Sequence, residues 1–251
     1  MKPALEPGPD ETLDRLSASL WILQRRRGHR ATSDDVLLAW AGARAAPDAR
    51  RALDLGTGKG TVALLLCRAL PAARIVGVEA FAASHALAVR NAALNGLADR
   101  FDPRHGDLRD PAVLAGEAPF DLVTGAPPFM PPGTGVLPAD PQRAAGRFEL
   151  RGGVEGYCAA AADQLAGDGR AVILMDGASR ARTLAAVAGA GLAARRIVEV
   201  TPRPGRPATF WIVEATRAPG PLVEEQLAMR DAAGEGWSTD YAAARAALEL
   251  P

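Results

Sequence analysis

The chain has 251 residues, a length that suits one large α/β domain as well as two small ones. Lys and Arg together number 29, as do Asp and Glu, so the formal net charge is zero. This balance argues against a strongly basic protein that binds nucleic acid non-specifically, although it permits a local basic patch. No run of about 18 uncharged apolar residues is present, so no membrane span is predicted. Cys67 and Cys158 are too few and too far apart for a zinc site or a disulfide framework, and no metal is expected.

The N-terminal part is predicted to be irregular and then helical. Residues 1–11 are rich in Pro and Gly and lack an apolar signal-peptide core, which predicts a disordered N-terminus on a cytoplasmic protein. From Thr12 to Arg27 the apolar residues recur at helical spacing. Ser33, Asp34 and Asp35 then predict the start of a second helix that runs through Trp40. Residues 12–46 are therefore predicted to form a helical N-terminal extension.

Residues 47–217 alternate between strand-like and helical runs. The predicted strands are Ala52–Leu55, Arg74–Glu79, Phe101–Gly106, Phe120–Thr124, Ala171–Met175, Ala194–Val200 and Thr209–Ala215. The predicted helices are Thr61–Leu70, Ser84–Asn95, Tyr157–Leu165 and Ser179–Ala190. This alternation predicts an α/β fold with a Rossmann-like, doubly wound, seven-stranded and mainly parallel sheet. No helix separates the last two strands, which predicts a C-terminal antiparallel hairpin, and residues 218–251 are expected to be a tail that packs on the domain.

The strongest motif is the segment Asp54–Gly60, with the sequence Asp-Leu-Gly-Thr-Gly-Lys-Gly, between a predicted strand and a predicted helix. Its glycines let the backbone turn sharply and approach a ligand closely. A dinucleotide-binding loop follows a plain apolar strand, whereas here Asp54 stands directly before the first glycine. An acid at that point accepts a hydrogen bond from an ammonium group, which S-adenosylmethionine carries and NAD lacks. The spacing to Lys59 excludes a P-loop. The predicted cofactor contacts in this loop are Asp54, Gly56, Thr57, Gly58 and Gly60.

Two further acidic residues end predicted strands of the same sheet. Glu79 lies about 20 residues after the loop, where a carboxylate binds the two hydroxyls of a ribose. Asp107 follows the third strand and is expected to contact the adenine amino group. Either acid alone would be interpreted as a solvated loop carboxylate. Together with Asp54 and the glycine loop, they favour a cofactor site.

The order of these motifs resembles the class I methyltransferases, and more closely the bacterial tRNA adenine-N6 methyltransferases that modify the adenosine just 3′ of the anticodon. Four segments between about residues 25 and 245 carry the resemblance: Gly28–Leu38, Asp54–Gly60, Ala126–Phe129, and Leu227–Arg230 with Gly234, Trp237–Thr239 and Tyr241. The glycine loop is common among methyltransferases, and the flanking segments narrow the match. The resemblance implies in-line transfer of the cofactor's methyl group, with N6 of an adenine in tRNA as the leading acceptor.

The segment Ala126–Phe129 departs from the family at its first position. The family has Asn-Pro-Pro-aromatic there, and its Asn side chain accepts a hydrogen bond from the target amino group. Ala126 lacks this acceptor, whereas Pro127 keeps a backbone carbonyl and Phe129 can stack on a flipped base. Loss of such a bond costs on the order of 100-fold in rate. Either another group replaces it or the acceptor is a different nucleophile. The resemblance implies Ala126, Pro127, Pro128 and Phe129 as the residues that hold the acceptor.

Two other features bear on the substrate. The Pro- and Gly-rich segment Met130–Arg147 is predicted to form a lid or wall of the pocket, with a plain connector as the alternative. Basic groups gather at Arg25–Arg30 and again at Arg195, Arg196, Arg203 and Arg206. One interpretation is that these residues are solvated, at the end of a helix and at the tip of the hairpin. If they flank the pocket instead, they would bind the phosphates of an RNA.

Two alternatives to tRNA methylation stay open. Ala126 and the neutral net charge favour methylation of a nitrogen or oxygen in a small molecule or a protein. The absence of the Asn is also consistent with a partner subunit that binds the cofactor but has no catalytic activity. The sequence does not indicate the oligomeric state.

Overall fold

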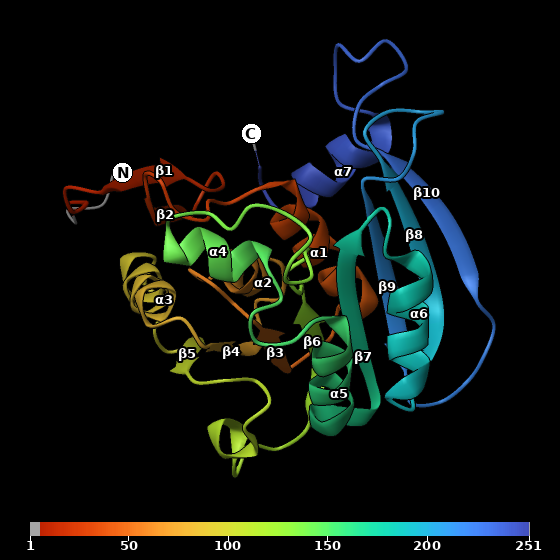
Figure 1. Ribbon diagram of the computed structural model, residues 1–251, viewed down its shortest axis with the longest axis horizontal. Coiled ribbons are helices and arrows are strands. Elements are labelled where there is room, and N and C mark those ends of the chain that lie inside the picture. Colours follow the sequence, from red (N-terminus) through yellow and green to blue (C-terminus); the bar gives the residue numbers. More distant parts are fainter. Residues whose placement is uncertain (1–5, 251) are drawn as a thin grey trace.

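The computed structural model describes residues 6–250 and contains a two-stranded hairpin, a large mixed sheet and helices on both faces of that sheet (Figure 1). The hairpin strands are β1 (Glu11–Arg15) and β2 (Trp21–Arg25). The large sheet contains β3 (Arg51–Leu55), β4 (Arg74–Glu79), β5 (Phe101–His105), β6 (Phe120–Gly125), β7 (Leu165–Asp176), β8 (Ala193–Thr201), β9 (Phe210–Thr216) and β10 (Val223–Ala228). The helices are α1 (Ser33–Ala45), α2 (Thr61–Ala69), α3 (Ala82–Leu94), α4 (Pro141–Arg147), α5 (Val154–Gln164), α6 (Arg180–Gly189), α7 (Thr239–Ala247) and the short 3-10 helix η1 (Pro111–Leu114).

The large sheet has eight strands in the order β10-β8-β9-β7-β6-β3-β4-β5. Its pairs are parallel except for β7 with β9 and β8 with β9, which are antiparallel. The mainly parallel sheet and its antiparallel β8–β9 hairpin are therefore confirmed. The predicted number of seven strands is wrong, because β10 pairs in parallel with β8. Within β10 only Leu227 is buried, so this edge strand carries too few apolar residues to be recognised in the sequence.

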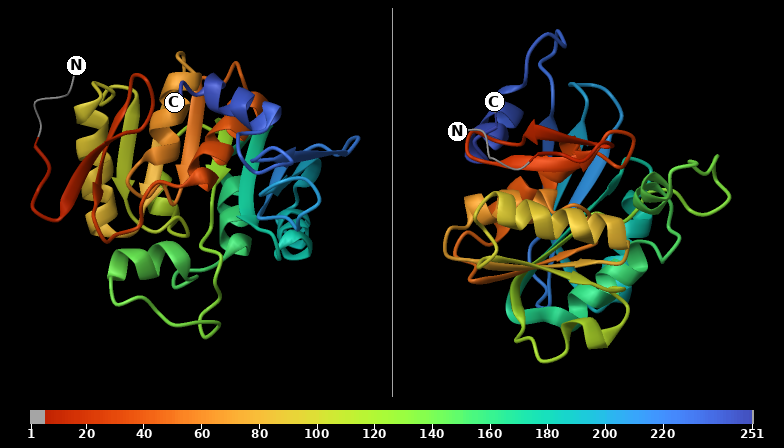
Figure 2. Two further views of the ribbon diagram at one scale, coloured as in Figure 1. Left: turned by 90° about the horizontal axis from the view of Figure 1, so that it is seen from above. Right: turned by 90° about the vertical axis from the view of Figure 1, so that its left-hand side faces the viewer.

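Helices cover both faces of the sheet (Figure 2), and an apolar layer lies on each face. One layer includes buried residues of α1, α2, α3 and α7, and the other includes buried residues of α5 and α6. Strand β3 serves both layers, because Ala52 packs in the first and Leu53 and Leu55 pack in the second. A strand buried on both faces reads as a nearly continuous apolar run. Asp54 interrupts that run, which marks the carboxyl end of β3 as a functional position.

The predicted helix over Thr12–Arg27 is wrong, because this segment forms the antiparallel hairpin β1–β2. The backbone of β2 has partners outside the hairpin: Asn91 of α3 bonds both the N–H (2.7 Å) and the carbonyl (3.0 Å) of Leu23. Asn95 makes the same two bonds to Trp21, at 2.8 Å each. These long-range bonds favour the extended chain over the helix that the local spacing predicts. The second predicted helix is present as α1.

The N-terminal hairpin is also bonded to the C-terminal part of the chain. The Ala18 N–H donates to the Glu249 carbonyl at 2.8 Å, and the Ser19 hydroxyl donates to the Glu249 carboxylate at 2.9 Å. Of the predicted disordered stretch 1–11, residues 1–5 lie outside the described residues. Residues 6–10 contain no helix or strand, and Glu11 opens β1. Among the described residues no helix is both long and apolar enough to cross a membrane.

Candidate functional site

A cavity of about 800 Å³ lies at the carboxyl ends of β3, β4 and β6. Ligands of open α/β sheets bind at this edge. The cavity brings together the predicted residues Asp54, Gly56, Thr57, Gly58, Glu79, Asp107, Ala126, Pro127, Pro128 and Phe129. Gly60 is the one predicted residue that does not line it. A Cβ at Gly60 would meet the Phe101 ring at 2.6 Å, so this glycine allows the loop to pack on the core.

The glycine loop needs its first glycine for both conformation and space. Gly56 has φ +66°, a left-handed conformation that side chains rarely adopt. A Cβ there would also lie 2.2 Å from the hydroxyl of Tyr157, a buried residue of α5. The loop that joins β3 to α2 therefore passes its backbone along the wall of the cavity at Gly56–Gly58.

Asp54 is buried, with only 2% of its surface exposed, at the end of β3. One carboxylate oxygen accepts a bond from the Thr57 hydroxyl at 2.6 Å and the other from the Thr124 hydroxyl at 2.8 Å. Burial raises the pKa of Asp54 to about 7, against the lowering effect of these two bonds. Each oxygen can accept a second hydrogen bond. The two hydroxyl bonds connect the glycine loop to β6 through Asp54. Contact of Asp54 with an ammonium group of the cofactor stays a prediction.

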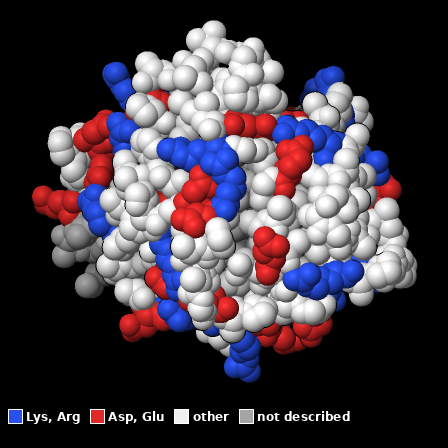
Figure 3. Space-filling view, turned by 60° about the horizontal axis from the view of Figure 1, so that its bottom comes forward, with Lys and Arg blue, Asp and Glu red and all other residues white. Residues whose placement is uncertain are grey.

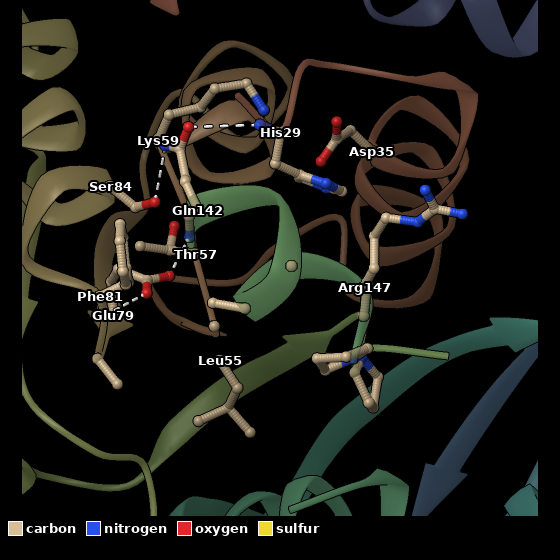
Figure 4. A pocket seen from close by; sticks show the side chains of 18 of the residues that line it. His29, Asp35, Leu55, Thr57, Lys59, Glu79, Phe81, Ser84, Gln142 and Arg147 are labelled. Atoms are coloured by element: carbon tan, nitrogen blue, oxygen red, sulfur yellow. Dashed lines mark hydrogen bonds between the residues drawn. The ribbon is translucent and has the colours of Figure 1, made fainter. Parts of the chain in front are cut away.

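Glu79 anchors the other side of the same loop (Figure 4). Its carboxylate accepts the Gly58 N–H at 2.8 Å and the Phe81 N–H at 2.6 Å. Burial raises the pKa of Glu79, and these two backbone bonds oppose the rise. The carboxylate is thus held rigidly at the mouth of the cavity. The remaining acceptor capacity of its oxygens is available to hydroxyl groups such as those of a ribose.

Asp107 occupies a more open position at the end of β5. Arg109 donates to both carboxylate oxygens, at 2.8 and 2.7 Å, and these hydrogen bonds lower the pKa of Asp107. The carboxylate is therefore ionised and oriented by its neighbour. The contact of Asp107 with the adenine stays a prediction. The sequence did not indicate that Arg109 orients this carboxylate.

Four further residues line the cavity that the sequence did not assign to the site: His29, Asp35, Lys59 and Gln142 (Figure 4). Burial lowers the pKa of His29 to about 4, with a further lowering by Lys59, so its imidazole is neutral near pH 7. Burial raises the pKa of Asp35 to about 6. These residues come from distant segments of the chain. The one signal in the sequence was a lysine inside the glycine loop.

The segment predicted as a lid or wall contains helix α4 and contributes Met130, Arg143 and Arg147 to the cavity lining. Gln142 attaches it to the domain. Its side-chain amide donates to the Ser84 hydroxyl at 2.9 Å, and its oxygen accepts the His29 N–H at 3.3 Å. Asp140 caps the helix through the Arg143 N–H at 2.9 Å and pairs with Arg25 at 2.9 Å. The segment thus forms a wall that bridges the N-terminal hairpin and α3.

The predicted acceptor residues follow β6 beside a second aromatic ring. Pro127 is buried, and Ala126 and Phe129 are half-buried. The ring of Phe129 lies 6.0 Å from that of Phe210, tilted by 50°, and Phe210 also lines the cavity. The acceptor end of the cavity is therefore apolar and aromatic, which suits a planar group.

The residues present fit S-adenosylmethionine. Backbone at Gly56–Gly58 lies in the cavity wall, and the position of Gly56 tolerates no side chain. Carboxylates stand at the ends of β3, β4 and β5, and Lys59 adds a cation at the far end. A ligand with ribose hydroxyls, an adenine amino group and a zwitterionic amino-acid end matches this set of donors and acceptors.

Comparisons with known proteins agree with this site. A family model described as "Methyltransferase domain" matches residues 52–131. The chain is 35% identical over 149 residues to a tRNA1(Val) (adenine(37)-N6)-methyltransferase of Porphyromonas gingivalis, and the match spans 58% of each protein's length. It is 41% identical over 88 residues to a release factor glutamine methyltransferase of Geobacter sulfurreducens, covering 35% of this chain and 29% of that protein.

A solved structure with the same fold is a predicted O-methyltransferase, Atu636, of Agrobacterium tumefaciens. The TM-score is 0.64 at 22% identity, and the match covers 87% of this chain and 98% of that one. The glycine loop, the acids at the strand ends and these matches lead to one conclusion. Residues 52–131 match a methyltransferase domain, and the matches support a class I S-adenosylmethionine-dependent methyltransferase.

Proposed function

We propose that the protein methylates N6 of an adenine in tRNA. The observation that carries this proposal is the distribution of arginines that form neither an ion pair nor a side-chain hydrogen bond among residues 6–250. Most such arginines lie at the edge of the sheet where the parallel strands end. Five of them line the cavity, and three lie in the loops after β8 and β10: Arg26, Arg27, Arg143, Arg147 and Arg151, and Arg203, Arg206 and Arg230. Arg50 and Arg195 lie at the opposite edge and are the exceptions.

Arginines elsewhere are mostly neutralised. On the face that Figure 3 shows, basic and acidic side chains lie next to one another, without a patch of one sign. Arg182, for example, pairs with both Glu149 and Glu155. Net charge is zero, yet the arginines without carboxylate partners gather where a substrate enters. A polyanion such as RNA would supply negatively charged partners for these arginines. This favours RNA over a neutral small molecule as the substrate.

The loops after β8 and β10 lie beyond the ends of these two strands, on the same side of the molecule (Figure 1). They lie side by side, because the Arg230 N–H donates to the Pro202 carbonyl at 3.0 Å. The guanidinium of Arg230 lies 3.7 Å from the ring centre of Trp237, which is 41% exposed. An exposed aromatic ring flanked by arginine is a surface on which nucleic-acid bases and phosphates bind.

The cavity residues have separable roles in this reaction. Glu79 binds the ribose of the cofactor, Asp107 faces its adenine, and Gly56–Gly58 line its path. When bound, S-adenosylmethionine supplies a methyl group on a positively charged sulfur. Phe129 and Phe210 hold the flipped base, and the Pro127 carbonyl accepts a hydrogen bond from the target amine. Catalysis rests on proximity and alignment, which need no strong general base.

The test is methyl transfer from labelled cofactor to bulk tRNA, followed by nucleoside analysis. We expect labelled N6-methyladenosine with the wild-type protein and a loss of about 100-fold or more with Phe129→Ala. Val89→Ala, an exposed change on α3, is the matched control and should retain full activity. Absence of labelled N6-methyladenosine would contradict the proposal. Tight cofactor binding without transfer to any acceptor would support a catalytically silent subunit.

A second candidate acceptor is an amide nitrogen in a protein. It is favoured by the match to the release factor glutamine methyltransferase, which covers about one third of this chain. The same labelled cofactor incubated with a ribosome-free cell extract separates the two candidates. Label in acid-precipitated protein, with none in RNA, would support the amide.

A further inference from the structure

Lys59 is a buried cation in the cavity wall that the proposed reaction does not use. It stands between Gly58 and Gly60 and is only 4% exposed. Its backbone is fixed, since its carbonyl accepts a bond from the Asn91 side chain at 2.9 Å. Its side chain lies at the end of the cavity occupied by His29 and Asp35, away from Glu79 (Figure 4).

The ammonium group of Lys59 forms no ion pair and no hydrogen bond with any residue from 6 to 250. Burial lowers the pKa of Lys59, Asp35 and Asp34 oppose this lowering from a distance, and Arg30 adds to it. Asp35 already accepts the Thr32 N–H at 3.0 Å as part of the cap of α1. A buried charge without a partner costs several kcal/mol. An anion that binds in the cavity next to Lys59 would offset this cost.

The geometry indicates which anion this is. With the ribose at Glu79 and the adenine toward Asp107, the rest of the cofactor extends along the glycine loop toward Lys59. That part carries a carboxylate. Arg27 and Arg206 are exposed and so accessible to an RNA backbone, whereas Lys59 is buried.

We infer that Lys59 binds the carboxylate of the amino-acid end of S-adenosylmethionine. This role gives the cavity two anchors for the cofactor, Glu79 for the ribose and Lys59 for the carboxylate. It depends on the cofactor of the family and is independent of the tRNA acceptor. The cavity should therefore discriminate between adenosine thioethers that have and lack this carboxylate.

Calorimetric titration of the full chain tests the inference without any acceptor substrate. The ligands are S-adenosylhomocysteine and 5′-methylthioadenosine, which lacks the amino-acid end. We expect Lys59→Met to weaken binding of S-adenosylhomocysteine by about 10- to 100-fold, the range for a hydrogen bond to a charged group. Binding of 5′-methylthioadenosine should stay within about twofold of wild type.

Thr61→Val is the matched control. Thr61 is the buried first residue of α2, two positions after Lys59 in the chain. It does not line the cavity, and its hydroxyl has no partner within residues 6–250. The variant should leave both affinities unchanged. An equal loss for both ligands with Lys59→Met would show a structural role and overturn the inference. So would unchanged affinity for S-adenosylhomocysteine together with weakened binding of tRNA.

A measurement on the wild-type protein keeps the inference testable if Lys59→Met does not fold. Decarboxylated S-adenosylhomocysteine keeps the ammonium group and lacks only the carboxylate. We expect the wild type to bind it about 10-fold or more weakly than S-adenosylhomocysteine. Equal affinity for the two ligands would overturn the assignment of the carboxylate to Lys59.

Discussion

Asp54 shows how one residue links the cofactor loop to the stability of the fold. Burial raises its pKa to about 7, whereas an unfolded chain has a value of about 3.9. The folded protein therefore holds the proton more tightly. The stabilising contribution of this group is complete below about pH 4 and is lost as the pH rises through about 7.

The variant Asp54→Asn removes this titration. Without cofactor, the wild type should lose unfolding free energy relative to the variant between about pH 5 and pH 8, by on the order of 2 kcal/mol. Urea unfolding at both pH values measures the difference. The same difference at the two pH values would contradict the raised pKa.

Ala126 is the residue that separates this chain from the Asn-Pro-Pro-aromatic pattern. Ala126→Asn places an amide oxygen beside the Pro127 carbonyl, at the acceptor end of the cavity. We expect methyl transfer to tRNA to rise by about 10-fold or more, because the added acceptor acts on the reacting amine. The affinity for cofactor should stay constant, and single-turnover rates measure the change. A decrease in rate would show that another group already occupies this position.

The residues that the sequence places at the site, and that line the cavity, come from short segments. The loop Asp54–Gly60 is such a segment, and so is the tetrapeptide Ala126–Phe129. The opposite end of the cavity was not predictable, because His29, Lys59 and Gln142 meet there from three segments. His29 and Gln142 are ordinary polar residues in their sequence context, and only Lys59 stands inside a recognised motif. Their burial, which gives them significance, arises only in the folded chain.

At the scale of elements, the N-terminal hairpin depends on α3. Asn91 bonds Leu23 and also the Lys59 carbonyl, whereas Asn95 bonds Trp21 and the backbone of its own helix. Asn91→Ala should therefore lower both stability, by roughly 2 kcal/mol or more, and cofactor affinity. Asn95→Ala is the control and should lower stability alone. Chemical unfolding and calorimetry separate the two effects, and equal affinities in both variants would disprove the link to the loop.

The same hairpin explains where element prediction failed. Leu13, Leu16, Leu20 and Leu23 have helical spacing, but two asparagines from a distant helix satisfy the backbone of β2. Strand β10 was missed for a related reason, since it is an exposed edge strand with one buried residue. The central strands were predictable because they are buried on both faces and consist of apolar runs.

At the scale of the whole molecule, the exposed arginines predict how salt affects RNA binding. The dissociation constant for tRNA should rise steeply with salt, because bound arginines release counterions from the RNA. The double variant Arg203→Ala/Arg206→Ala should reduce the slope of the log–log plot by about 1 to 2. Arg50→Ala, an exposed arginine at the opposite edge, is the control. Fluorescence anisotropy measures the slopes, and identical slopes would show that the tip loops do not contact phosphate.

The bonds from Ala18 and Ser19 to Glu249 have a consequence for the order of assembly. They join residues about 230 positions apart, and such contacts close late because the loop they close is long. Until they form, the hairpin is held by α3 and by the Arg25–Asp140 ion pair alone among the polar contacts described above. The hairpin end of the Asn91 bridge to the glycine loop is then less firmly fixed. An intermediate with a complete parallel sheet would therefore still bind cofactor weakly. In refolding experiments, cofactor binding should therefore recover in a later kinetic phase than the formation of the sheet.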